Sequence, residues 1–173
     1  EAVASALQEP LGDDEAPIAI RLPGETEAQS RTGELNIVSE NYFSVLELPI
    51  VRGRAFTQDE VRAQGPGPRP AILTETTARH LWQDTDPIGR MLLAGADPLV
   101  VVGISADAQV TSLGALDPYF VYVPGEGSAL FVKSLAGPDA TVSAVHAAAR
   151  ALDPALVLSA LPLISAGNFC CCL

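Results

Sequence analysis

Histidine is the side chain best suited to catalysis or metal binding at neutral pH, and the sequence has two, His80 and His146. Both lie in segments whose spacing predicts helices, and neither has a second His or Cys three or four residues away. We therefore expect no metal site from them. A Ser-His-Asp triad through His80 is the alternative, but the sequence has no GxSxG nucleophile elbow to support it.

Acidic residues and glycines also cluster, without the spacing of a cation or phosphate site. Asp13, Asp14 and Glu15 lie together in a predicted turn and lack the alternating oxygen ligands of a DxDxDG calcium loop. The glycines of GPGP, residues 65–68, are interrupted by prolines and are not followed by Lys and Ser or Thr. We therefore predict no cofactor, and neither binding nor hydrolysis of ATP by this chain.

The three cysteines are consecutive, Cys170, Cys171 and Cys172, one residue before the end of the given sequence. Adjacent cysteines rarely meet disulfide geometry with each other, and no CxxC or Cys/His spacing accompanies them. We interpret residues 166–173 as a terminal tail. Metal binding or lipidation through these thiols is the alternative.

Composition and charge exclude several classes of partner. The 173 residues are 48% apolar, enough for one compact domain or two small subdomains that share a boundary. The net charge is −11 with only ten basic residues, which argues against binding nucleic acid or anionic lipid headgroups. No apolar run reaches the length of a membrane span and no signal peptide is evident, so we expect the chain as given to be soluble.

Hydrophobic periodicity predicts short elements along the first two thirds of the chain. The opening residues have helical spacing that stops at Pro10 and Gly12, whereas Ile18 and Ile20 alternate with their neighbours as in a strand. Further strands are predicted at 34–39, 48–51, 71–73, 97–108 and 118–124, short helices at 42–46 and 76–82, and an exposed loop at 59–70. The 97–108 segment lacks alternation, which predicts a strand buried on both faces.

The last third predicts a β-α-β unit. Residues 128–135 alternate as a strand, 137–154 form a helix with Val142, Val145, Ala149 and Leu152 on one face, and 155–163 form a strand. The predicted opening helix and strand would join this unit in a split ferredoxin-like (porter-like) layer. The predicted class is therefore α+β, with one subdomain from 1–35 plus 126–165 and an inserted mixed α/β subdomain from 36–125.

Aromatic side chains remain as candidates for ligand contact. Trp82, Tyr119, Phe120 and Tyr122 could form a platform for a ligand. Their spacing within a predicted helix and strand instead favours packing in the core or between subdomains. We therefore predict that Trp82 is largely buried.

Several segments carry the pattern V-S-x-x-Y-F, P-x-x-x-G-R-x-F, A-x-x-x-W/F with P-I-G, V-V-G-V/I-x-x-D and Y-x-P. In this order and spacing the chain resembles the MacB-like periplasmic core domain found in FtsX-like permeases of ABC transporters. It departs at Thr74, where many relatives have asparagine, and at the NFCCCL ending, which does not lead into a membrane helix. The matching positions are Val38, Ser39, Tyr42, Phe43, Pro49, Gly53, Arg54, Phe56, Ala78, Trp82, Pro87, Ile88, Gly89, Val101, Val102, Gly103, Ile104, Asp107, Tyr122 and Pro124.

The resemblance implies a scaffold role for these positions, with no catalytic, cofactor-binding or metal-binding residue among them. Tyr42 and Phe43 would anchor a short helix, and Gly53 would allow a turn that a Cβ would crowd. Arg54 could hold a carboxylate or carbonyl oxygen with its planar guanidinium group. Together these positions would make a rigid body.

The resemblance also implies a location and a mechanism. The domain would be the extracytoplasmic, periplasmic part of a cytoplasmic-membrane permease, between its first and second transmembrane helices. ATP-driven closure of a cytoplasmic ATPase subunit would reach it through the parent helices and act on an extracytoplasmic substrate or partner. A second permease copy or domain and a periplasmic adaptor are further implied partners, and peptides, toxins, lipids and lipoproteins remain open as cargo.

Two other classes of function stay open at this point. One is a passive extracytoplasmic binding or receptor module, which flanking transmembrane spans and a neighbouring ATPase gene would exclude. The other is a hydrolase with a dispersed active site, which a pocket with converging perturbed groups would reveal.

Overall fold

The computed structural model describes residues 2–8, 17–63, 65–83, 85–107, 119–153, 161–165 and 168–172. Within these ranges the chain is a mixture of paired strands and a few short helices, as the predicted class requires. No helix in the described ranges has the length and apolar composition needed to cross a membrane.

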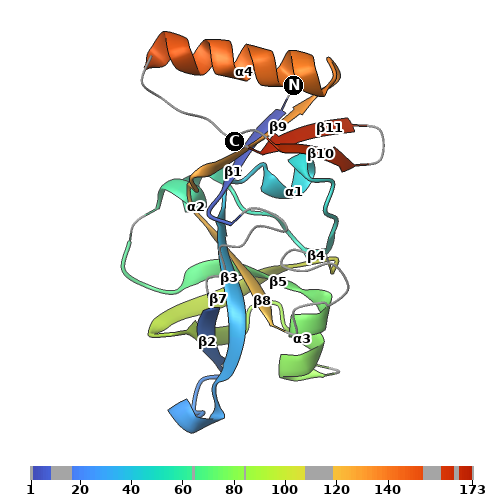
Figure 1. The fold of residues 1–173 in the computed structure, drawn as a ribbon. Coiled ribbons are helices and arrows are strands. Elements are labelled where there is room, and N and C mark those ends of the chain that lie inside the picture. Colours follow the sequence, from blue (N-terminus) through green and yellow to red (C-terminus); the bar gives the residue numbers. More distant parts are fainter. Residues whose placement is uncertain are drawn as a thin grey trace.

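Strands from both ends of the sequence lie side by side in the upper part of Figure 1. β9 (Ala129–Ser134) pairs antiparallel with β1 (Ala2–Ala6) on one edge and with β11 (Asn168–Cys172) on the other. β10 (Leu161–Ser165) pairs with β11 at the outside of this group, and α4 (Pro138–Leu152) runs across it. A single pair, Ala6 with Val38, continues the network from β1 into the rest of the molecule.

The other strands pair in a circuit below this group, and α3 (Glu75–Trp82) lies beside them (Figure 1). In the order given below, each strand is hydrogen-bonded to the next, and the last strand, β8, pairs in parallel with the first, β3, over five residue pairs. β4 (Ile50–Gly53) pairs with the end of β7. The circuit runs through β3 (Arg31–Val38), β2 (Pro17–Arg21), β6 (Met91–Ala94), β7 (Asp97–Ser105), β5 (Arg69–Thr74) and β8 (Phe120–Pro124).

Threonine side chains begin two of the helices. Thr57 accepts from the backbone N–H of Glu60 at 3.3 Å, while the Glu60 carboxylate accepts from the Thr57 N–H at 2.9 Å. Thr74 accepts from the Thr77 N–H at 3.3 Å, so the threonine that departs from the family pattern still caps its helix. Besides α4, the described helices are α1 (Tyr42–Val45), α2 (Gln58–Arg62), α3 (Glu75–Trp82) and the 3-10 turn η1 (Glu27–Gln29).

β8 separates two apolar cores, because successive side chains of a strand point to opposite faces. Phe120 and Tyr122 belong to a core that includes aromatic residues of α1 and β9. Val121 and Val123 belong to a second core that includes Trp82. All five residues of β8 are buried, so this strand lies within the interior, between the two cores.

Several sequence-based predictions of local structure were wrong. The opening residues form β1 rather than a helix, because pairing with β9 along five residues buries Ala4 and Ala6 and outweighs a weak helical spacing. Part of the predicted 59–70 loop is helix α2, which the capping box at Thr57 stabilises. Strand β6 was missed. β7 was predicted correctly, although Val100 and Val102 on its second face are only half buried.

The helix predicted at 137–154 is confirmed as α4, with Val142, Val145 and Ala149 half buried on one face. The strand predicted at 155–163 falls partly outside the described residues, as do Asp13, Asp14 and Glu15. β2 and β3, which precede residue 39, pair with β6 and β8 of the segment predicted to be inserted. The division into 1–35 plus 126–165 and 36–125 stays a prediction.

Candidate functional site

The aromatic pair of α1, Tyr42 and Phe43, belongs to the recognised pattern and lies in the core. Tyr42 and Phe43 are 1% and 3% exposed. The Tyr42 ring lies 5.8 Å from Phe131 of β9 in an edge-on contact and 5.8 Å from Tyr122 of β8. Phe43 lies 5.1 Å from Tyr122 and 6.1 Å from Phe56. This aromatic cluster therefore joins α1 to both groups of strands.

A second group of pattern residues closes the turn after β4. Gly53 has φ +73°, and a Cβ there would collide with the carbonyl oxygen of Val102. The Arg54 N–H donates to that same oxygen at 3.0 Å. The Arg54 guanidinium donates two hydrogen bonds, of 2.7 and 2.8 Å, to the Glu60 carboxylate and lowers the pKa of Glu60 to about 2. The turn is thus tied to α2.

Asp107 and Trp82 hold α3 at its two ends. The Asp107 carboxylate accepts from the backbone N–H of Thr76 at 2.9 Å and from its hydroxyl at 2.6 Å, which satisfies a free donor of the first helical turn. Trp82 is 9% exposed and belongs to the second core, so its predicted burial is confirmed. Asp107 belongs to the recognised family pattern, but the sequence alone did not indicate that it caps α3.

The remaining pattern residues fix turns and close approaches of the backbone. Gly89 has φ +79° in a turn after Pro87, and its N–H donates to the Val101 carbonyl at 2.8 Å. A Cβ on Gly103 would collide with the backbone of Arg54. The carbonyl groups of Pro49 and Pro124 accept hydrogen bonds from the Ala106 N–H at 2.9 Å and from the Arg69 guanidinium at 2.7 Å.

The side chains that could do chemistry do not converge in the described part of the chain. His80 lies on α3 with its ring 5.6 Å from Tyr119, and His146 lies on α4. No three His, Cys, Asp or Glu side chains among the described residues are close enough together to hold a metal ion. Besides Glu60, the pKa of Glu25 is lowered to about 2, chiefly by hydrogen bonds from Arg31. Both shifted carboxylates thus belong to Arg ion pairs.

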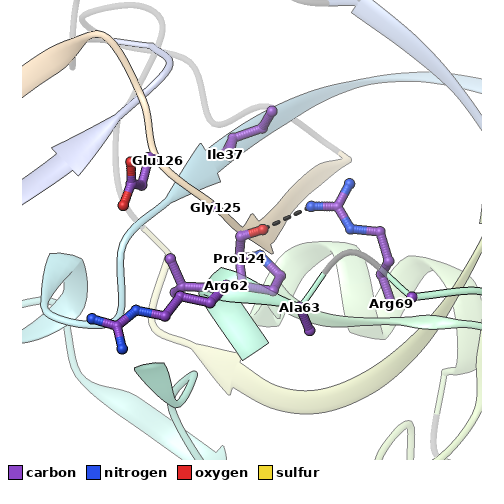
Figure 2. A pocket seen from close by; sticks show the side chains of 9 residues that line it. Ile37, Arg62, Ala63, Arg69, Pro124, Gly125 and Glu126 are labelled. Carbon is purple, nitrogen blue, oxygen red and sulfur yellow. Dashed lines mark hydrogen bonds between the residues drawn. The ribbon is translucent and has the colours of Figure 1, made fainter. Parts of the chain in front are cut away.

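An open groove of about 620 Å³ lies between α2, the end of β8 and the start of β5. Figure 2 shows the Arg62 and Arg69 side chains extending toward opposite ends of it, with Glu126 on the same side as Arg62. Sequence reasoning missed this groove, because its residues come from three separate stretches of the chain. It is lined by Ile37, Val61, Arg62, Ala63, Gly65, Arg69, Pro124, Gly125 and Glu126.

Comparison with known proteins identifies the family of the chain. The family described as the MacB-like periplasmic core domain matches residues 2–152. The chain is 33% identical over 101 residues to macrolide export ATP-binding/permease protein MacB 1/2 of Paracoccus denitrificans, covering 58% of this chain and 14% of that protein. It is 30% identical over 90 residues to the uncharacterized ABC transporter permease YknZ of Bacillus subtilis, covering 52% of this chain and 21% of YknZ. The chain therefore spans only a small part of these relatives.

Solved structures support the same fold. The periplasmic region of MacB from Actinobacillus actinomycetemcomitans has a TM-score of 0.54 and 19% identity, over 72% of this chain and 48% of that one. The extracellular domain of the noncanonic ABC-type transporter YknZ from Gram-positive bacteria has a TM-score of 0.51 and 24% identity, over 72% and 54%. Since the match to the family extends over residues 2–152, the chain belongs to the MacB-like periplasmic core domain family.

Proposed function

We propose that the chain is the extracytoplasmic domain of an ABC transporter permease, and that it transmits ATP-driven conformational change to an extracytoplasmic substrate or partner. The observation that carries the proposal is the match of residues 2–152 to the MacB-like periplasmic core domain family, together with the similarity to MacB and YknZ permeases. The fold shared with the periplasmic region of MacB supports an extracytoplasmic location. In the described fold, β1, β9 and β11 form a group of strands drawn from distant parts of the chain.

Transmission requires that movement of this strand group be passed to the rest of the domain. The aromatic cluster provides one connection, because Tyr42 contacts both Phe131 and Tyr122. Gln8 and Asn36 add two hydrogen bonds between the end of β1 and β3, of 3.0 and 3.2 Å. Close-packed interiors deform little, so these contacts favour movement of the described fold as one body.

The proposed partners follow from the family. They are the parent transmembrane helices, the cytoplasmic ATPase that acts through them, a second copy of the permease and a periplasmic adaptor. The domain's own expected inability to bind ATP fits this separation of roles and stays a prediction. The substrate stays open.

The test uses the full-length permease with its ATPase, in nanodiscs. We would replace Cys170, Cys171 and Cys172 by Ser, attach a spin label at Leu135→Cys, and measure the distance between the labels of two permease copies. Leu135 is 89% exposed, so the label should not disturb packing. We expect the distance to shift by several ångströms between the nucleotide-free state and a state with a non-hydrolysable ATP analogue. No shift would contradict transmission and favour the passive module. A full-length gene without flanking membrane spans would contradict the location as well.

A further inference from the structure

The groove lies where the pairing between β5 and β8 ends. These strands pair antiparallel only at Ile72 with Tyr122 and at Leu73 with Val121. The same register would place Pro70 opposite Pro124, and neither proline has an N–H to donate. The ladder therefore ends there, and the space beside it is the groove described above.

Guanidinium groups are the strongest hydrogen-bond donors at this groove. Arg62 is exposed on the last turn of α2 and forms no ion pair or hydrogen bond with another described residue. Arg69 donates one hydrogen bond to the Pro124 carbonyl, which leaves further donors of its guanidinium group available. A ligand in this groove is therefore recognised through acceptor groups, and best through carboxylates, which match the guanidinium geometry.

The charge of the groove is opposite in sign to that of the chain. The whole chain carries −11, yet two of its ten basic residues line this groove against one acidic residue, Glu126. Ile37, Val61 and Pro124 give it an apolar surface between the charged side chains. An acidic molecule is repelled by most of the surface and attracted here, which favours this position over others.

We propose that the groove binds an extended acidic peptide segment of an extracytoplasmic partner protein, with carboxylates at Arg62 and Arg69 and an apolar side chain between them. The two guanidinium groups lie toward opposite ends (Figure 2), so they suit a chain that carries two separated carboxylates better than a single lipid headgroup. This assignment names a partner class within the proposed function and relies on that function only for the partner's location.

The test is direct binding to the purified chain, measured by fluorescence anisotropy at low salt. The probe is a fluorescein-labelled seven-residue peptide of alternating Glu and Val. The matched control peptide has Gln in place of Glu. The diagnostic variant is Arg62→Glu, and its matched control is Arg150→Glu, the same charge change at an exposed position on α4. Circular dichroism of both variants establishes that they fold.

We expect saturable binding of the Glu peptide, at least tenfold weaker binding of the Gln peptide, and at least a tenfold loss with Arg62→Glu. Arg150→Glu should change the affinity less than twofold. Equal binding of the two peptides, equal losses in the two variants, or no binding at 1 mM peptide would each overturn the proposal. Displacement of the peptide by dodecanoate at lower concentration than by unlabelled peptide would also overturn it, in favour of an amphiphile. None of these results depends on transport, so the spin-label experiment tests the proposed function separately.

Discussion

Truncation of Trp82 tests whether the recognised aromatic positions form the scaffold. The indole is 9% exposed in the core that also contains Leu73 and Ile104. Burial of an indole removes about 200 Å² from water, and at about 25 cal/mol per Å² this amounts to at most about 5 kcal/mol. Trp82→Ala also leaves a cavity. We therefore expect the free energy of unfolding to fall by about 3–5 kcal/mol, a large part of the stability of a domain of this size.

The assay is urea denaturation followed by far-ultraviolet circular dichroism, which does not depend on the tryptophan signal. Trp82→Phe, which keeps an aromatic ring in the core, should lose less than Trp82→Ala. Leu135→Ala is the surface control, because Leu135 is 89% exposed, and it should change the stability by less than about 0.5 kcal/mol. A loss below about 1 kcal/mol for Trp82→Ala, combined with loss of partner binding, would refute the scaffold role and support a ligand platform.

Three further changes test individual contacts. Gly53→Ala should lower the free energy of unfolding by more than about 2 kcal/mol in urea melts, because Gly53 has φ +73° and a Cβ there would collide with the backbone. The control Gly24→Ala should cost only about 1 kcal/mol, because Gly24 has φ +92° but open space around it. Equal losses in the two variants would contradict the crowding argument. Asp107→Ala should lower stability by about 1–2 kcal/mol through loss of the α3 cap, and a neutral result would show that the cap is dispensable. The pKa of Glu25 is lowered from 4.5 to about 2 by Arg31, so its contribution to stability is present above pH 4.5 and lost as the pH falls toward 2. The stability advantage of wild type over Glu25→Gln, about 1 kcal/mol at pH 7, should disappear in acid melts over this window; an advantage that is constant with pH would contradict the ion pair as its source.

The local sequence correctly predicted the helices and strands whose apolar residues are regularly spaced and whose ends carry a capping residue or a proline. α3 follows a capping threonine, and α4 has Pro138 at its first turn and ends at Leu152, just before the C-cap residue Asp153. β8 is a continuous apolar and aromatic segment that ends at Pro124, and it was predicted correctly. In each case the signal lies within a few neighbouring residues.

Prediction from the sequence was wrong where pairing with a distant strand determines the local structure. AVASA has no strong preference of its own, and it becomes β1 because β9, more than 120 residues later, offers a partner along its whole length. The groove could not be predicted for the same reason. It depends on where the pairing of β5 with β8 ends, and a register between separate strands is not visible in either strand alone.

The recognised pattern and the proposed ligand groove share only Pro124, and this near-complete separation is physically reasonable. Asp107, Arg54 and Gly53 connect backbone segments, so their identities are constrained by the fold. Arg62 belongs to a short helix that the Arg54–Glu60 ion pair links to the turn after β4, while its own guanidinium group forms no bond within the described chain. Its side chain can therefore change without breaking a structural contact. Substitutions in the groove can therefore change the proposed peptide specificity while the framework stays the same.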